Sequence, residues 1–223
     1  MTAILLALIP VLVIIAYVYF MDKYDKEPGH LLLFSFLLGA IVSIIITTAI
    51  YIGFDMLFPP AEDFNVSHQF LKAFFVVALT EEFSKYIIVR YYAQPKHAFD
   101  EPYDGIMYAV MVSMGFAATE NIVYVLEGGM EVAILRAFTA IPAHATFGIL
   151  MGYFMGRAKF GKNRIVNNLL GLTLAVLFHG AYDFFLFIGF IPGIYLGAFV
   201  SLIIGIILSY RAIKAHQRNS VFK

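Results

Sequence analysis

Long apolar stretches dominate the chain, and short polar sequences separate them. Each stretch approaches the ~20 residues that an α-helix needs to cross a bilayer. They lie at about 3–20, 31–53, 69–92, 105–126, 131–157, 168–189 and 192–212. The intervening sequences FPPAEDFN, AQPKHAFDEPYDG, EGGME, KFGKNR and FIPG carry the glycine, proline and acidic residues typical of turns. The pattern predicts an all-α integral membrane protein with about seven transmembrane helices, forming one polytopic domain over residues 1–223.

Composition supports this class. Of the 223 residues, 61% are hydrophobic and 13% are charged, and the mean hydropathy is +0.85. Soluble domains are about 45–50% apolar and about 25% charged. The formal net charge is zero, so nothing indicates nucleic acid as a partner. The chain has no cysteine, which excludes disulfides, thiolate metal ligands and a cysteine nucleophile. We interpret the first stretch as a retained helix, because no basic region precedes it.

Lysine and arginine predict the orientation in the membrane. All but three of the 15 lie in the loops after the first, third and fifth stretches, in the C-terminal tail, or in the last residues of the stretches that lead into them. The exceptions are Lys72, Lys85 and Arg136, which lie elsewhere in predicted spans, and the loops on the opposite side hold none. Since cytoplasmic loops are enriched in these residues, the N-terminus is expected outside and the C-terminus in the cytoplasm.

Ionisable residues interrupt the third stretch. In VVALTEEFSKYII (76–88), Glu81 and Glu82 lie close to the predicted bilayer centre, and Lys85 lies one turn further in. Charged residues at this depth are costly and usually functional. A simpler interpretation is a structural ion pair between Glu81 and Lys85, which are spaced i, i+4.

Three later stretches bring further ionisable residues to a layer at or just outside the midplane. Glu120 lies about five residues, or roughly 7 Å, outward of the centre of the fourth stretch. His144 and His179 lie near the middle of the fifth and sixth, with Asp183 one turn outward of His179. Either histidine alone could simply bond to a neighbouring helix, and Asp183 could merely orient His179. Together with the glutamate pair, they predict one functional site at or just outside the midplane.

The residue types favour hydrolysis by an activated water molecule. Two carboxylates in a low-dielectric pocket will not both ionise, so one can act as a general base while Lys85 holds the other as an anion. Two facing histidines can polarise a carbonyl, stabilise an oxyanion or ligate a metal. Asp183 would fix the tautomer of His179. No serine or threonine stands beside a His/Asp arrangement, and HExxH is absent, so an acyl-enzyme is not favoured.

A set of short motifs makes the sequence similar to a known family. EEFSK (81–85), FAATEN (116–121), HATFG (144–148) and HGAYD (179–183), with DKYDKEP (22–28) and DEPYDG (100–105), resemble the PrsW family of bacterial membrane proteases. That family belongs to the superfamily of CAAX prenyl endopeptidases and Abi-type membrane proteins. The resemblance covers nearly the whole chain in the right order. It implies a multi-pass protein of the bacterial plasma membrane.

The resemblance also implies an activity and site residues. The expected activity is site-1 cleavage of a single-span anti-sigma factor near the extracytoplasmic face, as part of a stress response. CAAX enzymes typically have histidine where Glu120 stands and asparagine where Asp183 stands, so those two roles are not copied from them. The catalytic residues implied are Glu81 and Glu82 from the glutamate pair, Glu120 from F-x-x-x-E, His179 and Asp183 from H-x-x-x-D, and His144, with Lys85 and Asn121 in support.

The sequence leaves metal dependence open. Glu120, His144 and His179 could give zinc three ligands and an open fourth position. The same residues can work without metal, with glutamate activating water and the histidines stabilising the oxyanion. Because the chain lacks the close histidine pair of secure zinc motifs, we expect the metal-free glutamate mechanism, with zinc as the alternative.

Two other functions are compatible with ionisable residues at the midplane. An ion- or proton-coupled transporter uses such residues in its relay, although the chain shows no inverted repeat. A non-enzymatic membrane scaffold could retain the same fold. Two backbone features are also expected: a bend of the fifth helix near Pro142, and helix packing along a stripe of Gly148, Gly152 and Gly156.

Overall fold

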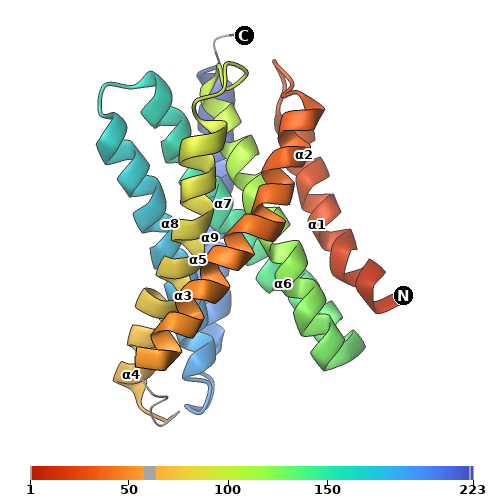
Figure 1. Ribbon diagram of the computed structural model, residues 1–223, viewed down its shortest axis with the longest axis vertical. Coiled ribbons are helices and arrows are strands. Elements are labelled where there is room, and N and C mark those ends of the chain that lie inside the picture. The colour runs from red at the N-terminus through yellow and green to blue at the C-terminus, as the bar shows by residue number, and fades with distance from the viewer. Residues whose placement is uncertain (1, 58–63, 221, 223) are drawn as a thin grey trace.

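The protein is a bundle of helices (Figure 1). A computed structural model describes residues 2–57, 64–220 and 222, and within these residues it contains no strand. The predicted all-α membrane class is therefore confirmed. Most of the predicted turn FPPAEDFN, at 58–63, lies outside the described residues, as does Lys223 of the predicted cytoplasmic tail.

The first three helical segments form the N-terminal part of the bundle. The chain begins with α1 (Thr2–Met21). A second, continuous segment consists of α2 (Gly29–Leu38), the π-helical turn η1 (Gly39–Ser43) and α3 (Ile44–Leu57). The third segment consists of α4 (Val66–Leu71), η2 (Lys72–Ala78), α5 (Leu79–Ile88) and η3 (Val89–Ala93).

The remaining helices are α6 (Pro102–Phe138), α7 (Ala140–Phe160), α8 (Arg164–Phe187) and α9 (Leu196–Arg218). In Figure 1, α1 lies at the right-hand edge of the bundle and α8 at the left, with α6 between them. The C-terminus and the turn between α1 and α2 lie at the same end.

Five segments of the described chain are long and apolar enough to cross a membrane: Ile4–Met21, Gly29–Leu57, Pro102–Phe160, Arg164–Phe187 and Leu196–Arg218. The segment Val66–Ala93 is also long enough to cross a membrane. It does not belong to this group because it contains too many charged residues. The predicted count of seven spans and the predicted orientation of the termini stay predictions.

The segment Pro102–Phe160 does not cross in one pass, because α6 reverses direction at Gly129. This glycine has φ 72° and ψ −154°, a conformation that other residues rarely adopt. Arg136 contacts Glu120, sixteen positions earlier, at 2.7 Å. A straight helix would separate such residues by roughly 24 Å. The predicted break in EGGME is thus the point of reversal.

A second break separates α6 from α7. Thr139 has non-helical angles, φ −123° and ψ −79°, and Pro142 follows within one turn. Proline lacks a backbone N–H, and its ring clashes with the carbonyl four residues earlier, here that of Phe138. The expected bend near Pro142 is confirmed.

Glycines allow α6 to pack closely on both sides. A Cβ on Gly152 would lie 2.2 Å from the carbonyl oxygen of Gly105, and one on Gly39 would lie 2.0 Å from that of Val112. Any larger residue would force these helices apart. The stripe of Gly148, Gly152 and Gly156 faces α6 along its length, so its interpretation as helix packing is confirmed.

Candidate active site

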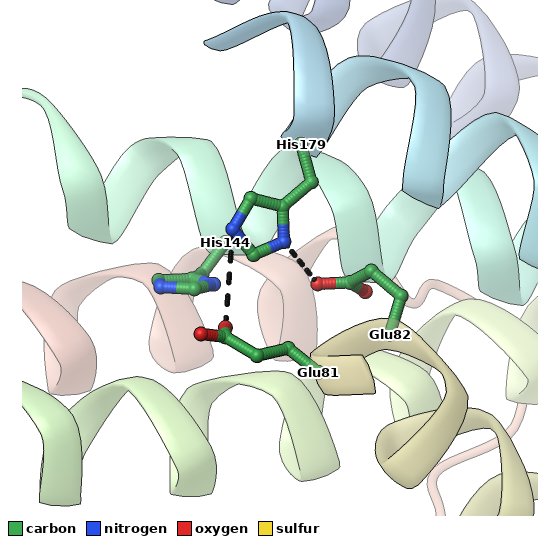
Figure 2. Close-up of side chains that lie close together, drawn as sticks. All are labelled: Glu81, Glu82, His144 and His179. Atoms are coloured by element: carbon green, nitrogen blue, oxygen red, sulfur yellow. Dashed lines mark hydrogen bonds and ion pairs between the residues drawn. The ribbon is translucent and has the colours of Figure 1, made fainter. Parts of the chain in front are cut away.

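Four ionisable side chains from three helices meet inside the bundle (Figure 2). Glu81 and Glu82 lie on α5, His144 on α7 and His179 on α8. One potential ligand atom from each lies within 4.8 Å of those of the other three. All four residues are at most 4% exposed. The structure thus brings together residues that are nearly 100 positions apart in the sequence.

Carboxylates contact both ring nitrogens of His179. Its Nδ1 lies 2.8 Å from Glu82 Oε1, and its Nε2 lies 3.2 Å from Asp183 Oδ2. Glu81 Oε2 is further from the same Nε2, at 3.8 Å. The ring also stacks on Phe147, with centroids 4.7 Å apart and planes inclined by 14°. These contacts fix the ring's orientation from two edges and one face.

His144 is held by Glu120. Its Nε2 lies 2.9 Å from Glu120 Oε2, and its Nδ1 lies 3.3 Å from Lys85 Nζ, on the side of the glutamate pair. Glu120 is not among the four converging residues, because its carboxylate lies behind the ring and also contacts Arg136. The structure therefore gathers Glu81 and Glu82 with the two histidines, whereas the zinc ligands considered from sequence included Glu120.

Lys85 neutralises part of the cluster. Its Nζ lies 2.6 Å from Glu82 Oε1 and 3.7 Å from Glu81 Oε2. It also lies 4.2 Å from the ring centroid of Phe116, and Lys85 is only 1% exposed. The i, i+4 spacing from Glu81 and the i, i+3 spacing from Glu82 bring Lys85 within reach of both carboxylates. The shorter contact is with Glu82, which fits a role of Lys85 in holding Glu82 as the anion.

A tyrosine that the sequence did not single out contacts the glutamate pair. Tyr51 on α3 donates a hydrogen bond to Glu81 Oε1 at 2.9 Å. Ser43 and Thr47 precede Tyr51 at intervals of four residues. Both form hydrogen bonds with Ser84 of α5. Residues spaced by four share a helix face. This hydroxyl stripe in an apolar stretch is the sequence signal that could have identified Tyr51.

Arg136 is the other residue without a predicted role. Besides its ion pair with Glu120, its Nε donates to Asn121 Oδ1 at 2.8 Å. The amide of Asn121 in turn donates to the carbonyl of Ala7 on α1 at 2.9 Å. Asn121 therefore supports the site indirectly, through Arg136 and α1. An arginine inside an apolar stretch is the sequence signal for such a contact.

A cavity of about 710 Å³ adjoins the cluster, lined by residues of α3, η2, α5, α6, α7 and α8. Glu81 lines it, whereas Glu82 and Lys85 lie behind. Glu81 and Glu82 are adjacent on α5, and adjacent side chains of a helix point about 100° apart, so only one of the two can face the cavity squarely. The other predicted site residues that line it are Glu120, His144, His179 and Asp183.

The cluster has the donors that a divalent metal ion needs. Oε2 of Glu81 and Oε2 of Glu82 are both buried without a hydrogen-bond partner among the described residues. A buried carboxylate oxygen without a partner is costly unless it binds a cation or a proton. Two imidazoles and two carboxylates are a donor set suited to zinc. The residues therefore fit a metal ion.

A protein-family model described as "PrsW family intramembrane metalloprotease" matches residues 27–209. The chain belongs to the PrsW family. The resemblance identified from the motifs is thus confirmed, and the protein is a membrane protease. No solved structure matches the chain.

Bacterial relatives named "Protease PrsW" match most of the chain. The relative from Oceanobacillus iheyensis is 39% identical over 178 residues, 79% of each chain. That from Geobacillus kaustophilus is 36% identical over 192 residues, 86% of this chain and 82% of its own. That from Clostridioides difficile is 34% identical over 216 residues, 93% and 86% respectively. With its apolar helices, the PrsW-family chain is a multi-pass bacterial membrane protein.

These matches favour the protease over the transporter and the scaffold considered from sequence. The family description names a metalloprotease, and the buried cluster offers metal ligands. Both observations favour the alternative of a bound metal over the metal-free mechanism expected from the sequence.

Proposed function

We propose that this PrsW-family protease performs site-1 cleavage of a single-span anti-sigma factor near its extracytoplasmic face, using water activated by Glu81 and a divalent metal ion. The observation that carries the mechanism is the position of Glu81. It is the member of the glutamate pair that lines the cavity, and its buried Oε2 has no hydrogen-bond partner among the described residues.

Glu82, His144 and His179 would hold the ion. Two histidines and one glutamate are a ligand set of catalytic zinc sites, which keep a further position open. A zinc ion in such a site supplies Lewis-acid chemistry for peptide hydrolysis. The zinc ligands considered from sequence were Glu120, His144 and His179. Glu82 replaces Glu120 here, because Glu120 Oε2 already contacts both His144 and Arg136.

Carboxylates behind the histidines would orient them. Glu120 contacts Nε2 of His144, and Asp183 contacts Nε2 of His179. Such contacts fix the tautomer and the ring direction of histidines that bind metals, and their loss typically costs ~10–100-fold in affinity or activity. This assigns orienting roles to Glu120 and Asp183.

Glu81 would act as general base and then as general acid. It takes a proton from the attacking water as the water oxygen bonds to the scissile carbonyl carbon. It then passes that proton to the amide nitrogen as the C–N bond breaks, leaving one new carboxylic acid and one new amine, which exchange a proton near neutral pH. The hydrogen bond from Tyr51 to Oε1 leaves Oε2 of Glu81 turned toward His179 and Lys85.

The family resemblance and the predicted topology support the substrate. The topology puts Glu120 and Asp183 outward of the bilayer centre, which suits cleavage near the extracytoplasmic face. The cavity of about 710 Å³ extends past both residues, to Tyr124 on α6 and Phe187 on α8. A peptide backbone emerging from a single span could enter there.

The test uses purified full-length protein in detergent and a peptide containing the span and outer segment of a candidate anti-sigma factor. We expect one defined cut in the outer segment, absent with Glu81→Gln. A transporter or a scaffold would leave the peptide intact. A cut of equal rate in Glu81→Gln would contradict the mechanism, and a cut on the cytoplasmic side would contradict the site-1 assignment.

A further inference from the structure

A second cavity, of about 450 Å³, lies between α1, α7 and α9. It touches α7 on the face opposite the catalytic cluster. Pro142, Ala145 and Ile149 line this groove, whereas Ala143, His144 and Phe147 line the first cavity. At about 100° per residue these two sets point in nearly opposite directions. The groove is therefore separate from the active site.

The α9 side of the groove carries polar groups next to an aliphatic part. Along α9, Ile206 and Ile207 line the groove first, Ser209 and Tyr210 follow, and Arg211 and Ile213 come after them. At ~1.5 Å per residue, the hydroxyl and the arginine are successive steps toward the C-terminal end of the helix. Aliphatic residues of the neighbouring helices, such as Ile14 of α1 and Ile149 of α7, face the same space.

The charged end of the groove has uncompensated positive charge. Arg211 lines the groove, and Lys214 Nζ lies 5.4 Å from the ring centroid of Tyr210, which also lines it. Neither cation takes part in an ion pair between described residues. Basic pockets between transmembrane helices on the cytoplasmic side bind anionic lipid headgroups.

Ser209 supplies a second, independent sign of a ligand. It is 4% exposed, and its Oγ is buried without a hydrogen-bond partner among the described residues. A buried hydroxyl without a partner costs free energy that an external acceptor would recover. Ser209 lies between the aliphatic part of the groove and Arg211, where the ester of a lipid would lie if its phosphate met the cations.

We propose that this groove binds an anionic phospholipid of the leaflet at the C-terminal end of α9. An acyl chain lies against Ile14, Ile149 and Ile206, Ser209 donates to an ester carbonyl, and Arg211 and Lys214 meet the phosphate. From Ile206 through Ser209 to Arg211, the apolar, hydroxyl and cationic groups follow one another as the parts of such a lipid do. The proposal does not depend on how the active site works.

Lipid retention by purified full-length protein tests the proposal. Phosphatidylglycerol and phosphatidylcholine with identical acyl chains are added at equal mole fractions, and bound lipid is measured by native mass spectrometry. We expect preferential retention of phosphatidylglycerol, with a larger rise in Tm. The double variant Arg211→Gln/Lys214→Gln should bind it about 30-fold more weakly, as expected for two cations lost beside an anionic headgroup.

The matched control is Lys162→Gln/Arg164→Gln. Lys162 lies in the turn before α8 and Arg164 is the first residue of that helix; both are exposed and neither lines the groove. The control should retain phosphatidylglycerol as the unchanged protein does. Equal retention of the two lipids by the unchanged protein, or equal loss in the two double variants, would overturn the proposal.

Two further measurements locate the ligand. Ile207→Trp fills the aliphatic part of the groove and should abolish preferential retention while the cations remain. Glycerol phosphate, which has the headgroup chemistry without acyl chains, should not displace the lipid. Persistent retention in Ile207→Trp, or displacement by glycerol phosphate, would show that the groove is not an acyl-chain site. Displacement by a single-span peptide would assign the groove to a helix instead.

Discussion

The carboxylate of Glu120 contacts the imidazole of His144 from the side away from the glutamate pair, with Oε2 2.9 Å from Nε2. The opposite ring nitrogen, Nδ1, is turned toward Lys85 and the centre of the cluster. Glu120 is in turn fixed by Arg136, at 2.7 Å. His144 therefore has one nitrogen held by a carboxylate and the other facing Lys85 and the glutamate pair.

The first prediction concerns this contact. Glu120→Gln keeps the shape of the side chain but removes the charge that holds His144 and Arg136. Cleavage and metal affinity should each fall ~10–100-fold, as for other carboxylates behind metal-binding histidines. Peptide cleavage and metal titration of the purified variant check this. Glu127→Gln, at an exposed position of the same helix, is the control, and an equal effect in both variants would refute the orienting role.

His179 and Asp183 should differ in the severity of their loss. His179→Ala removes a proposed metal ligand and should abolish cleavage. Asp183→Ala removes only the contact at 3.2 Å that orients the ring, so it should cost ~10–100-fold. Single-turnover cleavage rates of the two variants are the measurement. A larger loss in Asp183→Ala than in His179→Ala would require the roles to be exchanged.

Tyr51→Phe should impair turnover without impairing folding. The variant loses one hydrogen bond of 2.9 Å to the proposed general base. Hydrogen bonds to charged groups contribute ~1.5–3 kcal/mol, so kcat should fall ~10–100-fold with little change in KM. Tyr124→Phe is the matched control, because Tyr124 lines the same cavity and contacts Arg136 through its ring. Equal kcat values for the two variants would remove Tyr51 from the mechanism.

Glu27, in the acidic motif DKYDKEP between α1 and α2, predicts that the stability of the fold depends on pH. Burial raises the pKa of Glu27 from its ordinary value of 4.5 to about 7, against a hydrogen bond from Tyr108 that lowers it. At a pH between these two pKa values, the folded protein therefore binds more protons than the unfolded chain. The resulting stabilisation is fully present below pH 4.5 and is lost as pH rises through about 7.

Thermal unfolding in detergent between pH 5 and pH 8 measures this effect. Tm should fall as pH rises, and Glu27→Gln, which cannot titrate, should show a weaker fall. Glu127→Gln serves as the exposed control and should keep the original slope. A steeper slope in Glu27→Gln would contradict the assignment.

Much of the architecture could be predicted from the sequence, because bilayer crossing imposes a strong pattern. The break at EGGME and the bend near Pro142 were both readable, since glycine and proline have fixed backbone consequences. Ionisable residues inside apolar stretches marked the cluster, because burial of charge without function is costly. That is why Glu81, Glu82, His144 and His179 could be named before their contacts were known.

The arrangement of ligands could not be predicted in the same way. Depth in the membrane does not say which face of a helix a side chain occupies relative to other helices. Glu120 and Glu82 belong to one predicted layer at or just outside the midplane, yet one lies behind His144 and the other contacts His179. Tyr51 was missed because a tyrosine in an apolar stretch is ordinary, and only the packing of α3 on α5 brings it to Glu81.

The most direct test of the account compares metal content and cleavage in Glu81→Gln and Glu82→Gln. The unchanged protein should contain stoichiometric zinc, lose cleavage on chelation and regain it when zinc returns. Glu81→Gln should retain the metal but cleave at least ~100-fold more slowly, because it lacks the base, whereas Glu82→Gln should lose both metal and cleavage. Near-normal cleavage by both variants, or full activity in chelated protein free of metal, would contradict the account.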